Sequence, residues 1–146
     1  MMVNSRIQQV NIHKLIIILF YLMFLCIGIS INKVTGDVIV ADKLNHRVQV
    51  FTSDGKFIRK FGSEGNLDGQ FYFPTAVTVL NSGHILVSDQ NNHRIQIFTE
   101  HGFYIHKFGS KGTGDGQLKE PSGILVNNAG NVVVCDTGNN RLQIFV

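Results

Sequence analysis

The chain repeats itself every 47 residues, and this period constrains its fold more than any other feature. Residues 40–51 (VADKLNHRVQVF) return as residues 87–98 (VSDQNNHRIQIF) and again as residues 134–145 (VCDTGNNRLQIF), with no insertion or deletion between the copies. Several glycines and a proline outside this segment recur at the same spacing. Such a period is typical of a repeat architecture, in which each copy is one supersecondary unit that stacks on the next.

Each 47-residue unit is predicted to form four short strands. In the second copy we expect them at residues 76–80, 85–88, 94–98 and 104–108. Val, Ile and Phe fill these segments, while Gly, Asn and Asp lie between them, as β-hairpins require. Four strands in roughly 40–50 residues, repeated in tandem, are typical of a β-propeller blade.

The predicted fold is therefore all-β, as a partial and open propeller. We expect a first blade at about residues 28–73, a second at about residues 74–120 and a partial third at about residues 121–146. Closed propellers contain roughly four to eight blades, so these three do not close a ring by themselves. Their open sheet edges favour self-association or pairing with further blades.

The repeated motif resembles a known family. The pattern Asp-x-x-Asn-His-Arg and the Phe-Gly-Ser-x-Gly linkers at Phe61–Gly65 and Phe108–Gly112 resemble the NHL repeat, and the resemblance covers about four-fifths of the chain. The triplet that gives the family its name is present at residues 45–47 and 92–94, and as Asn-Asn-Arg at residues 139–141. The linkers look most similar to those of tripartite-motif proteins, in which an NHL propeller is the recognition domain of a RING-type ubiquitin ligase.

The resemblance implies that the chain recognises a partner. Recruitment of a protein substrate for ubiquitination is the first expectation, and binding of single-stranded RNA through the same surface is the alternative. NHL-type propellers also occur in a peptide-amidating lyase. However, this chain shows no RING pattern and no Ser-His-Asp or Cys-His arrangement, and the glycine-rich loop 109–117 lacks the Gly-Lys-Ser/Thr ending of a phosphate loop. We expect no enzyme activity and no cofactor.

The N-terminal segment has several possible interpretations. A polar and basic leader, residues 1–14, precedes an uncharged run at residues 15–31. A helix of that length spans about 25 Å, near the short limit for a membrane anchor or a signal peptide. The expectation is a hydrophobic helix that associates the chain with a membrane; a cytoplasmic chain is the alternative if the leader is not native. A competing possibility is a blade strand, since residues 28–32 (GISIN) resemble residues 123–127 (GILVN).

Six charged residues recur identically and are predicted to form the structural framework of the blades: Asp42, Arg47, Asp89, Arg94, Asp136 and Arg141. Each carboxylate is expected to accept turn N–H groups and to pair with the arginine five residues later. His46 and His93 occupy equivalent corners of separate blades, so we expect turn hydrogen bonds from them and no metal site.

Strand parity predicts where a partner binds. The turn between the second and third strands and the crossover between blades lie on one rim, whose residues vary between copies. Variable loops on a constant scaffold suit recognition. The predicted rim residues are Lys43, Leu44, Asn45, His46, Gln90, Asn91, Asn92, His93, Lys111, Thr113, Thr137, Asn139 and Asn140, together with Glu64, Asn66, Leu67, Asp68, Asp115 and Gln117. This rim mixes both charges, and the chain lacks tryptophan, which favours a protein over RNA.

Overall fold

A computed structural model describes residues 26–146 and confirms the all-β prediction with three antiparallel, blade-like sheets. The first sheet comprises β1 (Cys26–Ile31), β2 (Val38–Asp42), β3 (Arg47–Phe51) and β4 (Phe57–Phe61). The second comprises β5 (Pro74–Val79), β6 (Ile85–Asp89), β7 (Arg94–Phe98) and β8 (Tyr104–Phe108). The third comprises β9 (Pro121–Val126), β10 (Val132–Asp136) and β11 (Arg141–Phe145). We call these sheets blades 1, 2 and 3.

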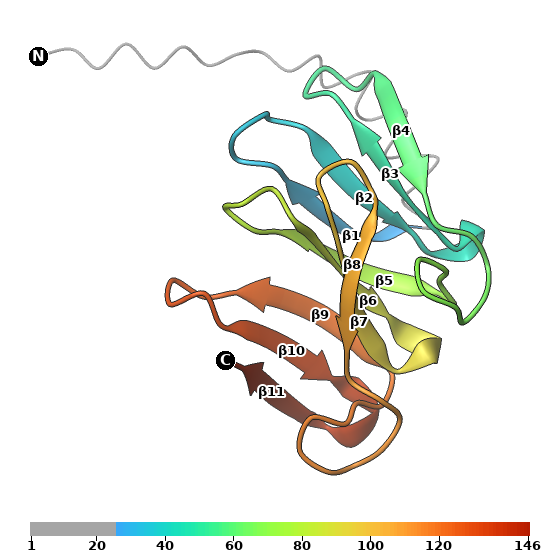
Figure 1. Ribbon diagram of the computed structural model, residues 1–146, viewed down its shortest axis with the longest axis vertical. Coiled ribbons are helices and arrows are strands. Elements are labelled where there is room, and N and C mark those ends of the chain that lie inside the picture. The colour runs from blue at the N-terminus through green and yellow to red at the C-terminus, as the bar shows by residue number, and fades with distance from the viewer. Residues whose placement is uncertain (1–25) are drawn as a thin grey trace, which may run out of the picture.

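The blades stack on one another through their first strands, with β5 lying between β1 and β9 (Figure 1). Alternate residues of a strand point to opposite faces of its sheet, and blade 2 is covered on both faces. Val87 enters a core shared with blade 1, whereas its neighbour Leu86 enters a second core shared with blade 3. This two-sided burial explains why successive residues Ile85, Leu86 and Val87 of β6 are all apolar.

A single 3-10 turn joins the second and third strands of each blade: η1 (Lys43–Asn45), η2 (Gln90–Asn92) and η3 (Thr137–Asn139). Each turn ends on a left-handed residue, with φ of 51° at His46, 56° at His93 and 51° at Asn140. Asparagine and histidine tolerate this conformation better than most residues, because their short polar side chains bond locally. The geometry therefore accounts for the exchange of histidine for asparagine in the third copy.

The predicted membrane association through a hydrophobic helix at residues 15–31 is wrong. The last six residues of that segment, Cys26–Ile31, form strand β1 and pair with β2. Their backbone groups are used by the sheet, so the same residues cannot belong to a transmembrane helix. Within residues 26–146, no helix has the length and apolar character needed to cross a bilayer. The leader at residues 1–14 and the remainder of the predicted helix, residues 15–25, lie outside the described residues.

Candidate rim of turns and crossovers

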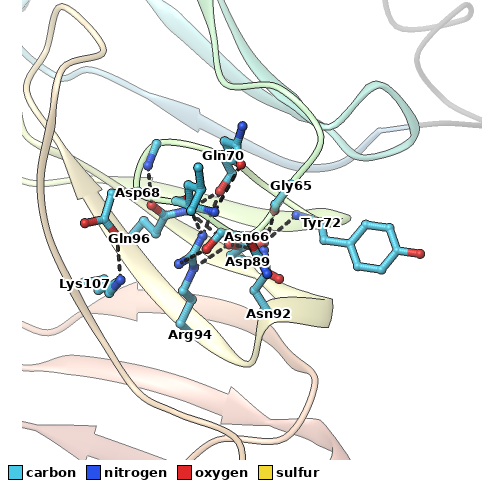
Figure 2. A network of polar contacts seen from close by, with 12 residues as sticks. Gly65, Asn66, Asp68, Gln70, Tyr72, Asp89, Asn92, Arg94, Gln96 and Lys107 are labelled. Carbon is cyan, nitrogen blue, oxygen red and sulfur yellow. Dashed lines mark hydrogen bonds and ion pairs between the residues drawn. The ribbon is translucent and has the colours of Figure 1, made fainter.

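Each blade crossover is fastened to the turn of the blade that follows it. In blade 2 the buried carboxylate of Asp89 is the centre of this contact (Figure 2). Its Oδ1 accepts the backbone N–H of Tyr72 at 2.7 Å, and its Oδ2 accepts Arg94 Nε at 2.7 Å. The same Oδ2 also accepts the side-chain amides of Asn92 at 2.9 Å and Gln96 at 3.0 Å. One carboxylate thus joins two strands, a turn and the incoming crossover.

The arginine of the network binds the backbone of crossover 62–73. Arg94 donates from its two terminal nitrogens to three carbonyl oxygens, those of Asn66, Leu67 and Gln70, at 2.9–3.0 Å. Asn92 adds a bond to the carbonyl of Gly65 at 2.9 Å. Blade 3 repeats this arrangement around Asp136, with Asn139, Arg141 and Gln143 bound to crossover 109–120. The crossovers are therefore rigid parts of the scaffold.

The environment of the two equivalent carboxylates differs between blades. Burial between two neighbouring blades raises the pKa of Asp89 above its ordinary value, although the hydrogen bonds it accepts from Tyr72, Asn92 and Arg94 oppose the change. Burial acts in the same direction on Asp136, but there its hydrogen bonds outweigh it and the pKa of Asp136 is lowered. The outer face of blade 3 is uncovered within residues 26–146, so its carboxylate loses less solvation than the one in blade 2.

The histidines fasten each turn to the next crossover. His46 Nδ1 accepts the backbone N–H of Phe73 at 3.2 Å, and His93 Nδ1 accepts that of Glu120 at 3.0 Å. Both donors immediately precede a proline and have positive φ, 60° at Phe73 and 50° at Glu120. Non-glycine residues adopt this conformation at a cost and keep it where the surroundings hold them. The pKa of His93 is lowered, first by burial and then by the charge of Lys111.

The structure brings the predicted rim residues together in two kinds of position. The framework pairs Asp42–Arg47, Asp89–Arg94 and Asp136–Arg141 form ion pairs at 2.7–2.8 Å. Asn45, Asn92 and Asn139 bond to those carboxylates, so their side-chain nitrogens are used inside the scaffold. The exposed members of the rim are Leu44, Asn45, Glu64, Asn66, Leu67, Asp68, Asn91, Lys111, Thr113, Asp115, Thr137 and Asn140.

An aromatic group on this rim was missed by the reasoning from sequence. Tyr72 stacks on Phe73 with a centroid separation of 4.9 Å and on His46 at 5.5 Å. The Lys43 ammonium lies 5.7 Å from the centre of the Phe73 ring, a cation–π contact. Tyr72 is 40% exposed. One signal was present in the sequence, because this aromatic pair breaks the repeat: Lys119 and Glu120 stand 47 residues later.

A shallow pocket of about 380 Å³ opens beside this aromatic group, lined by Glu64, Gly65, Asn66, Tyr72 and Asn92. Within the part of the chain that the structure describes, no group of three or more His, Cys, Asp or Glu side chains is placed to hold a metal ion. The arrangement offers a rigid surface with exposed side chains.

Comparisons with known proteins agree with this architecture. The family model described as "NHL repeat" matches residues 25–51, 71–98 and 118–145, more than half of the chain. The chain is similar to "Protein brain tumor" of Drosophila melanogaster, with 44% identity over 57 residues, which cover 38% of this chain and 5% of that protein. The similarity to tripartite-motif proteins in particular finds no further support.

Two solved structures show the same arrangement of blades. Virginiamycin B lyase from Staphylococcus aureus superposes with a TM-score of 0.64 at 15% identity, over 84% of this chain and 38% of the other. An auxiliary nutrient binding protein from Bacteroides thetaiotaomicron gives 0.64 at 14% identity, over 80% and 36%. At such identities the likeness concerns the fold alone. The chain spans well under half the length of each of these proteins.

Proposed function

We propose that this chain, which belongs to the NHL-repeat family, is a binding module whose rim recognises a protein. By the rim we mean the turns η1–η3 and the crossovers 62–73 and 109–120. The supporting observation is that one set of residues holds the scaffold together while a different set is exposed on it. The framework contacts are the same at both blade junctions, whereas the side chains exposed there differ: Glu64 and Tyr72 at one, Lys111 and Lys119 at the other. Variable side chains on a rigid backbone are suited to recognition.

The charges of the rim favour a protein as the partner. The half-buried Lys43 and the exposed Lys111 are accompanied by Glu64, Asp68 and Asp115 on the same rim. A nucleic-acid surface needs a continuous basic stripe to neutralise phosphates. A mixed surface with exposed Leu44 and Tyr72 instead resembles a protein interface, where aromatic and apolar anchors are surrounded by polar groups.

Affinity capture with two matched variants tests this proposal. Leu44→Arg with Asn91→Arg alters the rim at two exposed turn residues, and Asn81→Arg with Asn128→Arg adds the same charge at turns of the opposite end. A protein bound by the wild type and by the opposite-end variant, but lost from the rim variant, is the expected result. Calorimetry with that purified protein then measures the loss of affinity in the rim variant, which is expected to be at least about tenfold for a substituted interface anchor. Equal retention by both variants would contradict the proposal.

We further propose that the bound protein is a substrate for ubiquitination. The support is the likeness of the linkers Phe61–Gly65 and Phe108–Gly112 to those of tripartite-motif ubiquitin ligases. The chain expressed by itself then competes with the complete ligase for its substrate and lengthens the substrate's half-life. Pulse-chase measurement of the captured protein, with the rim variant as the control, tests this role; an unchanged half-life argues against it.

Single-stranded RNA is the second candidate, and one observation favours it. At the junction of blades 2 and 3, Lys111 and Lys119 lie on the same crossover as the backbone N–H bound by His93. Two cations near an imidazole suit a phosphate and a stacked base. RNA binding predicts an affinity that falls steeply with salt, and Lys111→Glu would reduce both the affinity and the slope.

We also propose that the outer face of blade 3 is covered by another blade, supplied by more chain or by a second copy. Leu142 and Ile144 are 66% and 62% exposed, whereas Ile95, which stands 47 residues before Leu142, is fully buried against blade 3. Sedimentation of the 146-residue chain as a dimer or larger species, reduced by Leu142→Glu, is the expected result. A monomer unaffected by that substitution would contradict coverage by a second copy.

A further inference from the structure

The two blade junctions share the same framework contacts but differ in charge at equivalent positions. At the first, Glu64 and Tyr72 line a pocket with Gly65, Asn66 and Asn92. The residues 47 positions later are Lys111, Gly112, Thr113, Lys119 and Asn139. The glycine and the asparagine that fasten the crossover are therefore retained, while the acidic and aromatic side chains are both replaced by lysine. The first junction thus presents a different chemistry on a shared scaffold.

The pocket at the first junction is rich in unused hydrogen-bond acceptors. The Glu64 carboxylate makes no hydrogen bond or ion pair within residues 26–146, and neither does the Tyr72 hydroxyl. Asn92 Nδ2 donates to two oxygens, those of Gly65 and Asp89. Because both of its partners accept, the orientation of this amide is fixed, and its Oδ1 is left as a further acceptor.

The aromatic wall is held in place by its backbone. The Tyr72 N–H donates to Asp89 at 2.7 Å, and its carbonyl accepts the N–H of Asn91 at 3.0 Å. Its ring stacks on Phe73 and His46, and the side chain is 40% exposed. A ring fixed in this way presents a flat π-face without losing conformational freedom on binding.

From this combination we propose that the pocket binds an arginine side chain of the partner protein. The inference rests on the proposed function, because it names what the rim recognises at this point. A guanidinium carries five donors and no acceptor, stacks on an aromatic face and pairs with a carboxylate. It therefore matches a pocket that offers a tyrosine ring, a free carboxylate and an oriented amide oxygen. The carboxylate disfavours a nucleic-acid phosphate at the same place.

The second junction supplies the test. The probes are the peptide acetyl-Gly-Arg-Gly-amide and the same peptide with citrulline, which has a similar shape and no charge. Amide chemical shifts of the full chain, followed during titration, report binding at Gly65, Asn66 and Asn92 and, as an internal control, at Gly112, Thr113 and Asn139. We expect the arginine peptide to shift the first group alone and the citrulline peptide to bind about five- to tenfold more weakly.

Substitutions taken from the chain's own repeat complete the test. Glu64→Lys and Tyr72→Lys introduce the residues that the second junction already carries, so the scaffold tolerates them, and each is expected to weaken arginine binding at least about fivefold. Lys111→Glu with Lys119→Tyr is expected to transfer the site, with new shifts at Gly112 and Asn139. Full dispersion of the spectra confirms that each variant is folded.

Three outcomes would overturn the proposal: equal shifts at both junctions, binding unchanged by Glu64→Lys, or stronger shifts of the same amides by oligouridine than by the arginine peptide. These outcomes are separable from a failure of the proposed function. If partner capture depends on Leu44 and Asn91 but is unchanged by Glu64→Lys, the rim binds a protein without an arginine in this pocket. If capture depends on neither, the proposed function fails as well.

Discussion

Replacing Asp89 by asparagine is expected to destabilise the protein far more than the equivalent change in blade 1. Asp89 accepts four hydrogen bonds, one on Oδ1 from the Tyr72 N–H and three on Oδ2 from Asn92, Arg94 and Gln96. An asparagine side chain offers one oxygen and one NH2 group. In either orientation the NH2 group faces at least one donor, and Arg94, whose side chain is 7% exposed, loses its counter-charge.

The magnitude follows from the burial of the pair. Removing one partner of a buried ion pair costs about 3–5 kcal/mol, because the remaining charge stays buried without compensation. Asp42 provides the matched control. Among the described residues it accepts only the side chains of Asn45, Arg47 and Gln49, and Arg47 is 29% exposed. Water can solvate that arginine, so Asp42→Asn is expected to cost about 1–2 kcal/mol.

Urea denaturation followed by far-UV circular dichroism measures the difference between these two variants. Stacked repeats can unfold in steps, so hydrogen exchange of crossover 62–73 is followed in parallel. We expect that crossover to lose protection in Asp89→Asn and to keep it in Asp42→Asn. Equal shifts in the unfolding midpoint, or a larger shift for Asp42→Asn, would refute the argument that the buried carboxylate organises the junction.

Three further predictions concern the turns and the third blade. His93→Ala is expected to lower the free energy of unfolding by about 1–2 kcal/mol, since a left-handed residue and the acceptor for the next crossover are both lost; an unchanged melting temperature would contradict this. Gly62→Ala should cost about 3 kcal/mol, because φ is +91° and a Cβ there overlaps the Phe71 ring, whereas Gly130→Ala, with φ +87° and open space, should cost about 1–2 kcal/mol. Denaturation of both variants tests that order. The pKa of Asp136 is lowered on folding, so its ionised form stabilises the folded state at pH values above the reference pKa of 3.8. This stabilisation is lost as the pH falls through the pKa of the folded state. The melting-temperature difference between wild type and Asp136→Asn should therefore shrink in acid, and a constant difference would show that ionisation plays no part.

The framework residues of the site were predicted from the repeat, whereas the aromatic residue Tyr72 was missed. Residues identical in all three copies, such as Asp89 and Arg94, were predicted to form the framework, and in the structure they bind one another. Tyr72 was not predicted because it is not part of the recurring motif, and Lys119 stands at the equivalent position. Comparing Glu64 with Lys111 and Tyr72 with Lys119 across the period would have found the difference.

The sequence by itself determined the strands, the turns and their order, because a strict 47-residue period carries local information three times. It also determined the family, through a motif in which each turn residue has its own backbone requirement, as at His93 and Asn140. The N-terminal run could not be decided in this way, because an uncharged apolar segment is equally suited to a bilayer and to a strand between two blades. The pairing with β2 decided it for the last six residues of the run, Cys26–Ile31. The tertiary structure also placed Glu64, Tyr72 and Asn92 around one pocket, because crossover and turn meet only when the blades stack.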